Sequence, residues 1–166
     1  MSAVLTTIKN FLGQFSGDVL LLISLTIIIF GAVFYFGKAR AVTFVISFHL
    51  ASILYLTFPF LDRLFFLDEP RMLALNKIGI FLVFFIILYF ITSKFISTAL
   101  VYDAGTGIVK KLLITAGILV CVLIFVYQMA DITDLYDFSP HIDQLFDSEA
   151  KLFYWKAATL LLLAII

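Results

Sequence analysis

Charged residues are scarce in this sequence. Asp, Glu, Lys and Arg make up 13% of the 166 residues, whereas an ordinary globular domain has about 25%. Apolar residues make up 64%, and the mean hydropathy is +1.18. A chain of this kind cannot build the charged exterior that a water-soluble domain requires. The composition therefore predicts a single-domain integral membrane protein that is surrounded by the lipid bilayer.

The sequence also has no net charge, only one cysteine and no recognisable catalytic motif. The formal net charge is zero, which gives no electrostatic basis for binding nucleic acid or an acidic substrate. Cys121 is the single cysteine, so the chain has no internal disulfide. The sequence contains no His-Glu-x-x-His, Gly-x-Ser-x-Gly or Gly-x-x-x-x-Gly-Lys-Ser/Thr motif. We expect no enzyme here, with no catalytic residue, no cofactor and no metal site.

Four apolar segments approach or reach the roughly 20 residues that span a bilayer core: 19–36, 41–60, 78–100 and 112–130. Short turns join the first pair and the second pair. The first turn contains Gly37, Lys38 and Arg40, and the second contains Gly105 and Gly107. Residues 61–76, which mix charged and bulky apolar side chains, are expected to form an interfacial loop. The sequence thus predicts an all-α membrane protein with about four transmembrane helices in two hairpins.

The two ends of the chain differ from these spans. Apolar residues recur at helical spacing over 3–15, which predicts an amphipathic helix in the headgroup plane. Residues 131–149 carry six carboxylates and no Lys or Arg. Because their spacing matches no calcium loop, we interpret them as a polar acidic segment in water. Residues 152–166 would rise only about 22 Å as a helix, which favours an interfacial or partly inserted helix over a fifth span.

Small residues in two spans mark candidate helix-packing faces. Thr43, Ser47 and Ala51 recur every four residues in the second span, and Gly117 and Cys121 do so in the fourth. Small side chains let two helix backbones approach closely inside a bilayer. We expect these faces to support packing or self-association.

Two basic residues lie within the spans. His49 is near the middle of the second span, where an ionisable group is a candidate for an ion or proton pathway. The alternative is a neutral imidazole that joins helices by hydrogen bonds, with Tyr55, Thr57 or Lys94 as candidate partners. Lys94 is close enough to the end of the third span for its ammonium group to reach the interface, although a role beside a pathway stays open.

The distribution of basic residues gives a weak indication of orientation. Five lie in or beside the two turns, and six lie on the opposite side, so the count alone does not decide. The turn-side charges are concentrated in very short loops, which favours cytoplasmic turns. They are Lys38, Arg40, Lys94, Lys110 and Lys111.

Several short features together resemble the colicin V production (CvpA-like) family of small bacterial inner-membrane proteins. These are Asp18 before the first span, the basic turn Gly37–Ala41, the glycine-bearing turn 104–107 and the step Phe138-Ser139-Pro140. The sequence departs from the family where Ala41 replaces a glycine and where Gly107 replaces an Asp. The resemblance implies a bacterial inner-membrane protein linked to toxin production or export, or to envelope maintenance, and it implies no catalytic residue.

Two functions of different classes follow. The first is an assembly or accessory component that associates with itself or with a larger membrane complex. The alternative is a subunit of a small-solute or ion channel or transporter, with His49 lining the path.

Overall fold

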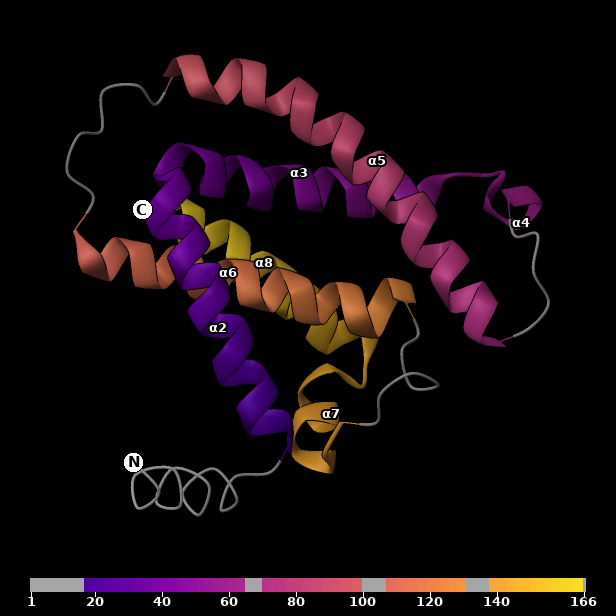
Figure 1. Ribbon diagram of the computed structural model, residues 1–166. Coiled ribbons are helices and arrows are strands. Elements are labelled where there is room, and N and C mark those ends of the chain that lie inside the picture. Colours follow the sequence, from indigo (N-terminus) through magenta and orange to yellow (C-terminus); the bar gives the residue numbers. More distant parts are fainter. Residues whose placement is uncertain (1–16, 65–69, 100–106, 131–137, 166) are drawn as a thin grey trace, which may run out of the picture.

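The computed structural model describes residues 17–64, 70–99, 107–130 and 138–165, which are helical apart from short connections (Figure 1). Four of these helices are long and apolar enough to cross a membrane, namely α2 (Gly17–Phe36), α3 (Lys38–Thr57), α5 (Pro70–Ala99) and α6 (Ile108–Phe125). The predicted all-α class with four candidate spans is confirmed. The predicted interfacial helix over 3–15 and Gly105 lie outside the described residues.

A single glycine joins α2 to α3. Gly37 has φ +83° and ψ 169°, a conformation that is essentially restricted to glycine. Its N–H donates to the carbonyl of Val33 at 3.0 Å, and α3 begins at the next residue, Lys38. The tight turn expected from the sequence is therefore made by Gly37, while Lys38 and Arg40 belong to the first turn of α3.

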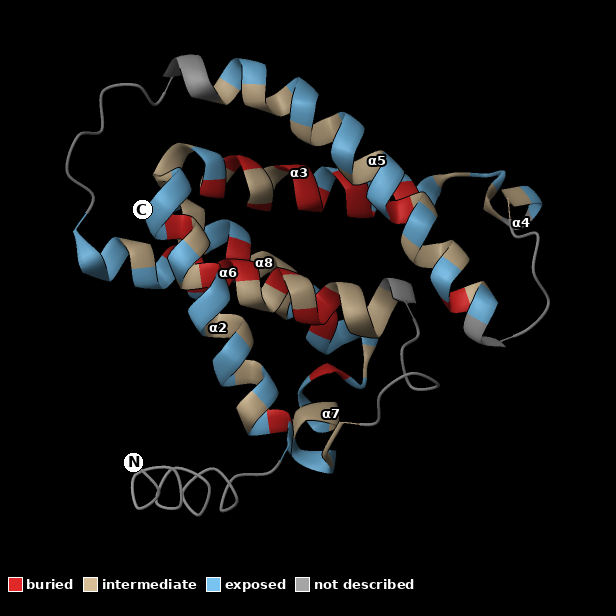
Figure 2. Ribbon diagram, in the orientation of Figure 1, coloured by how far each residue is buried: buried red, intermediate tan, exposed pale blue. Residues whose placement is uncertain are grey.

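The helix α3 lies at the centre of the bundle. It packs chiefly against α5 on one side and against α6 on the other, while α2 crosses α6 (Figure 1). Half of the most apolar stretch of α3 is buried within the chain, compared with 11% in α2 and in α5 (Figure 2). The apolar stretches of α2 and α5 are more hydrophobic than that of α3 and yet remain exposed. Their outer faces must therefore be covered by lipid or by another protein.

The helix that contains the third span begins earlier than the sequence predicted. Residues 61–76 were expected to form an interfacial loop, but they include the short helix α4 (Leu61–Leu64) and the start of α5 at Pro70. Proline is favoured in the first turn of a helix, where its missing N–H breaks no hydrogen bond. With 30 residues, α5 is about 45 Å long and extends beyond a bilayer core of about 30 Å.

The C-terminal part of the chain closes one end of the bundle. A π-helical segment, η1 (Val126–Ala130), extends α6, and α7 (Pro140–Phe146) and α8 (Glu149–Ile165) follow. The Phe146 ring stacks between Tyr127 and Trp155, with ring centroids 5.1 and 5.7 Å apart. Part of the predicted aqueous segment 131–149 is thus helical and packed, and 131–137 lie outside the described residues.

The last helix packs beside a candidate span. The 17-residue helix α8 contacts α6 and, to a smaller extent, α3. Its Thr159 lies against His49 near the middle of α3. One face of α8, which includes Thr159, therefore packs against the bundle, whereas Leu161 and Ile165 are exposed. Whether this helix is partly inserted or a full span stays a prediction.

Candidate functional site

His49 joins α3 to α8 in the interior of the bundle. The side chain is 7% exposed, and its Nδ1 lies 2.8 Å from the carbonyl oxygen of Val45. Because a carbonyl oxygen only accepts, Nδ1 carries a proton. Nε2 lies 2.9 Å from the hydroxyl oxygen of Thr159 and 3.3 Å from the carbonyl oxygen of Lys156. Both ring nitrogens therefore have partners within the chain. This arrangement favours the interpretation of His49 as a polar contact between helices.

Thr159 extends this contact to a third helix. Its hydroxyl donates to the carbonyl of Lys156 within α8 at 2.8 Å and lies beside the Cys121 side chain on α6. Thr159 and Cys121 are both buried. The three side chains thus join α3, α6 and α8. Tyr55, Thr57 and Lys94, the partners considered from the sequence, do not fill this role: Thr57 donates to its own helix, to the carbonyl of Ile53.

The small-residue faces are used inside the chain. Thr43, Ser47 and Ala51 are all buried, and Ser47 makes a short hydroxyl–hydroxyl hydrogen bond with Thr92 on α5. On α6, a Cβ added at Gly117 would lie 3.6 Å from the Cδ2 of Leu162 on α8. These faces hold the bundle together, so the described surface does not present them to a second molecule.

Lys94 and Gly107 lie away from this interior. Lys94 is exposed on α5, close to its C-terminal end. Gly107 is the residue preceding α6, and its carbonyl accepts from the N–H of Lys111 at 3.3 Å. The structure therefore does not bring Lys94 and His49 together.

Carboxylates of the C-terminal segment are engaged by neighbouring side chains. Tyr127 donates its hydroxyl proton to Asp143 at 2.6 Å, and Lys151 pairs with Asp147 at 2.8 Å. Asp131, Asp134 and Asp137 lie outside the described residues. In the part of the chain that the structure describes, no group of three or more His, Cys, Asp or Glu side chains could hold a metal ion.

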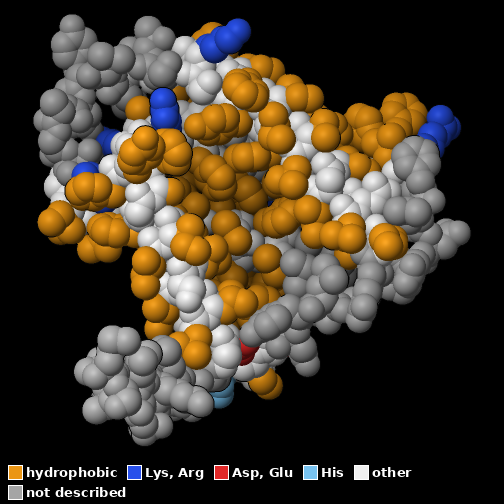
Figure 3. All heavy atoms as spheres, in the orientation of Figure 1, with side chains coloured by type: hydrophobic (Ala, Val, Ile, Leu, Met, Phe, Trp, Pro, Cys, Tyr) orange, Lys and Arg blue, Asp and Glu red, His pale blue; other side chains and the backbone are white. Residues whose placement is uncertain are grey.

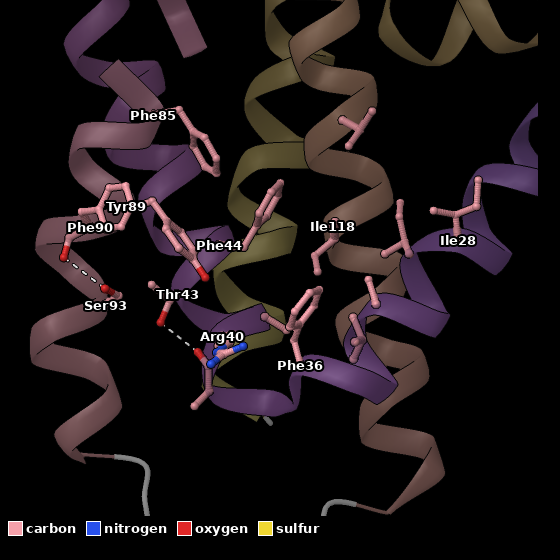
Figure 4. A pocket seen from close by; sticks show the side chains of 16 residues that line it. Ile28, Phe36, Arg40, Thr43, Phe44, Phe85, Tyr89, Phe90, Ser93 and Ile118 are labelled. Carbon is pink, nitrogen blue, oxygen red and sulfur yellow. Dashed lines mark hydrogen bonds between the residues drawn. The ribbon is translucent and has the colours of Figure 1, made fainter. Parts of the chain in front are cut away.

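An apolar groove lies between four helices of the described bundle. It has a volume of about 800 Å³ and is lined by residues of α2, α3, α5 and α6 (Figure 3). Figure 4 shows Phe44, Phe85 and Tyr89 on one side of it and Ile28 and Ile118 on the other. Its volume falls within the range of about 300–1,000 Å³ that is usual for ligand sites.

One charged side chain lines this groove. Arg40, in the first turn of α3, lies at one end of it beside Phe36, with the guanidinium carbon 5.5 Å from the centre of the Phe36 ring (Figure 4). The sequence identified Arg40 only as a turn residue. It gave no signal for the groove, because the groove depends on how far α2 and α5 diverge, and the apolar pattern of each helix leaves that divergence undetermined.

The four candidate spans and the lipid-facing apolar surface indicate a multi-pass membrane protein. No protein-family model, no curated protein and no solved structure matches this chain.

Proposed function

We propose that this chain is an assembly or accessory component of a bacterial inner-membrane complex, in the role that the CvpA-like resemblance implies. The complex would serve toxin production or export, or envelope maintenance. The chain acts in it by binding other subunits and not by catalysis.

The engagement of the buried polar side chains is the observation that carries this proposal. His49 hydrogen-bonds to Val45 within α3 and to Thr159 on α8. Ser47 on α3 hydrogen-bonds to Thr92 on α5. A conduction path needs polar groups that face water or the transported ion. The imidazole of His49 and the described interior hydroxyls instead bond one another or the backbone, which supports a structural role. Gln128 Oε1, near the end of α6, is a buried oxygen without a hydrogen-bond partner in the described part of the chain.

The outer faces of α2 and α5 supply the surface for assembly. Ile27 on α2 is 66% exposed and Val83 on α5 is 54% exposed, and neither lines the groove. A large exposed apolar surface within membrane spans is suited to lipid and to partner helices alike. Since the small-residue faces are buried inside the bundle, partner subunits would contact the bulkier side chains on the outer faces of α2 and α5.

A contact between two of the resembling features adds support. The carboxylate of Asp18, in the first turn of α2, accepts from the backbone N–H of Ser139 at 2.7 Å. Asp18 and Ser139 are 121 residues apart and were noted independently in the sequence. Their contact gives a structural reason for an acidic residue before the first span and a polar step after the last.

The channel alternative would require His49 to face a path. The described residues of the groove do not include His49, so this alternative draws no support from the bundle and stays a prediction.

Purification of the tagged chain from its native membranes in mild detergent, followed by native mass measurement, tests the proposal. We expect a complex with stoichiometric partner subunits. The variants Ile27→Trp and Val83→Trp should reduce partner retention without loss of fold, whereas Ser47→Leu should first destabilise the chain itself. A chain that purifies alone and whose liposomes conduct ions until His49 is replaced by alanine would overturn the proposal.

A further inference from the structure

The groove between α2, α3, α5 and α6 lies at membrane depth. Its lining runs from Ile28 to Phe36 along α2 and from Phe85 to Ser93 along α5. Each of these stretches rises about 12 Å, so the groove is elongated along the spans. Ile28 and Phe90 line it and are 68% and 64% exposed. In a bilayer, the groove therefore opens sideways toward the lipid chains.

The walls of the groove are suited to hydrocarbon. Most of the lining side chains are aliphatic or aromatic. Thr43 donates to the carbonyl of Ala39 at 2.8 Å, and Ser93 donates to that of Phe90 at 3.0 Å. Both hydroxyl protons are thus already donated to backbone carbonyls, so these two side chains have no further proton to donate to a ligand. Apolar walls with few polar groups favour an apolar occupant.

The end of the groove is suited to an anion. Arg40 lines this end, and Lys38, Lys94, Lys110 and Lys111 lie in the adjoining ends of α3, α5 and α6. The acidic residues of the described helices are Asp18 in α2, Asp62 in α4 and those from α7 to the start of α8, and these segments lie away from this end. Guanidinium binds phosphate oxygens through two parallel hydrogen bonds, and clustered basic residues beside a span attract anionic lipid.

We propose that the groove binds one anionic phospholipid of the surrounding bilayer, with an acyl chain between α2 and α5 and the phosphate at Arg40. The occupant carries charge opposite to the end it reaches and hydrocarbon that matches the walls. A second copy of the chain fits less well. Copies inserted with the same orientation bring their basic ends to the same side of the membrane, where like charges repel. The lipid site does not depend on the proposed assembly role.

Native mass spectrometry of the purified, progressively delipidated protein tests this site. Phosphatidylglycerol and phosphatidylcholine with identical acyl chains serve as probes. We expect one lipid to be retained after the others are lost, with phosphatidylglycerol preferred. Arg40→Gln should lower that preference about fivefold, which corresponds to the contribution of about 1 kcal/mol from one basic residue. Ala32→Phe, which places a ring in the groove, should abolish retention of the lipid.

Two matched variants control for charge and volume. Arg63 on α4 stacks over Phe60 at 5.3 Å, much as Arg40 does over Phe36, but it lies outside the groove. Arg63→Gln should leave the lipid preference unchanged, and so should Ala116→Phe on the exposed face of α6. Equal retention of both lipids, an unchanged preference in Arg40→Gln, or a full lipid complement in folded Ala32→Phe would overturn the proposal. A native dimer that excludes lipid from the groove would do so too.

Discussion

The hydrogen bond between His49 and Thr159 should contribute measurably to the stability of the bundle. Thr159→Val removes the hydroxyl at nearly constant volume and leaves Nε2 of the buried imidazole without that partner. Hydrogen bonds between membrane helices average about 0.6 kcal/mol and reach about 1.7 kcal/mol. Because the ring and Thr159 are both buried and the hydroxyl also donates to the carbonyl of Lys156, we expect a loss of about 1–2 kcal/mol in the free energy of unfolding.

A double-mutant cycle separates the histidine contact from the cysteine contact. His49→Phe keeps a planar ring and removes both ring nitrogens. The contacts of the Thr159 hydroxyl with Cys121 and with the carbonyl of Lys156 are lost from Thr159→Val in either background, so they cancel in the coupling energy. The remaining coupling of His49 with Thr159 should be about 0.5–1.5 kcal/mol. Replacing both partners by apolar residues should cost less than the sum of the single changes.

The assay is reversible unfolding in mixed detergent micelles, followed by the fluorescence of Trp155. This is the single tryptophan of the chain, and it lies on α8 beside Phe146. Thr115→Val is the matched control, because Thr115 is equally buried and donates only to its own helix, to the carbonyl of Lys111. A coupling energy of zero, or an equal loss in Thr115→Val, would refute the reasoning.

Three further variants test other parts of the fold, each measured by the same unfolding assay. Gly37→Ala should destabilise the chain by about 1–3 kcal/mol, since Gly37 adopts a conformation that strains other residues; Gly31→Ala, in open space within α2, should be neutral or stabilising. Tyr127→Phe removes the hydroxyl that donates to Asp143 and should lower stability by about 1–2 kcal/mol, and an unchanged value would contradict that contact. Gly117→Leu overfills the close approach of α6 to α8 and should destabilise by about 1–3 kcal/mol, whereas a tolerated leucine would place α8 elsewhere.

The spans could be predicted because a bilayer imposes a simple rule on the chain. Long apolar runs and a glycine turn at Gly37 are local features, and the structure places helices over all four runs. The start of α5 was missed because charged residues near Pro70 suggested a loop. A helix that extends beyond the bilayer core can carry charges in its first turns, so composition alone marks the membrane boundary and not the helix boundary.

The partners of the polar residues could not be predicted in the same way. Thr159 is 110 residues from His49. It also donates to the carbonyl of Lys156 in its own helix, and nothing in a short apolar helix indicates that such a threonine contacts a second helix as well. The packing role of Ser47 and Gly117 was foreseeable from their spacing, but the partner helix was not. That choice depends on how α3, α5, α6 and α8 cross, which is a property of the whole bundle.

Photo-crosslinking in intact native membranes tests most directly whether the chain acts by assembly. A photoreactive residue is placed at Val83, on the exposed face of α5, and at Val45, in the buried centre of α3. We predict a discrete adduct with a partner protein from Val83 and none with another chain from Val45. If Val83 and the exposed Ile27 on α2 yield only lipid adducts, the outer faces bind no partner and the assembly role is contradicted.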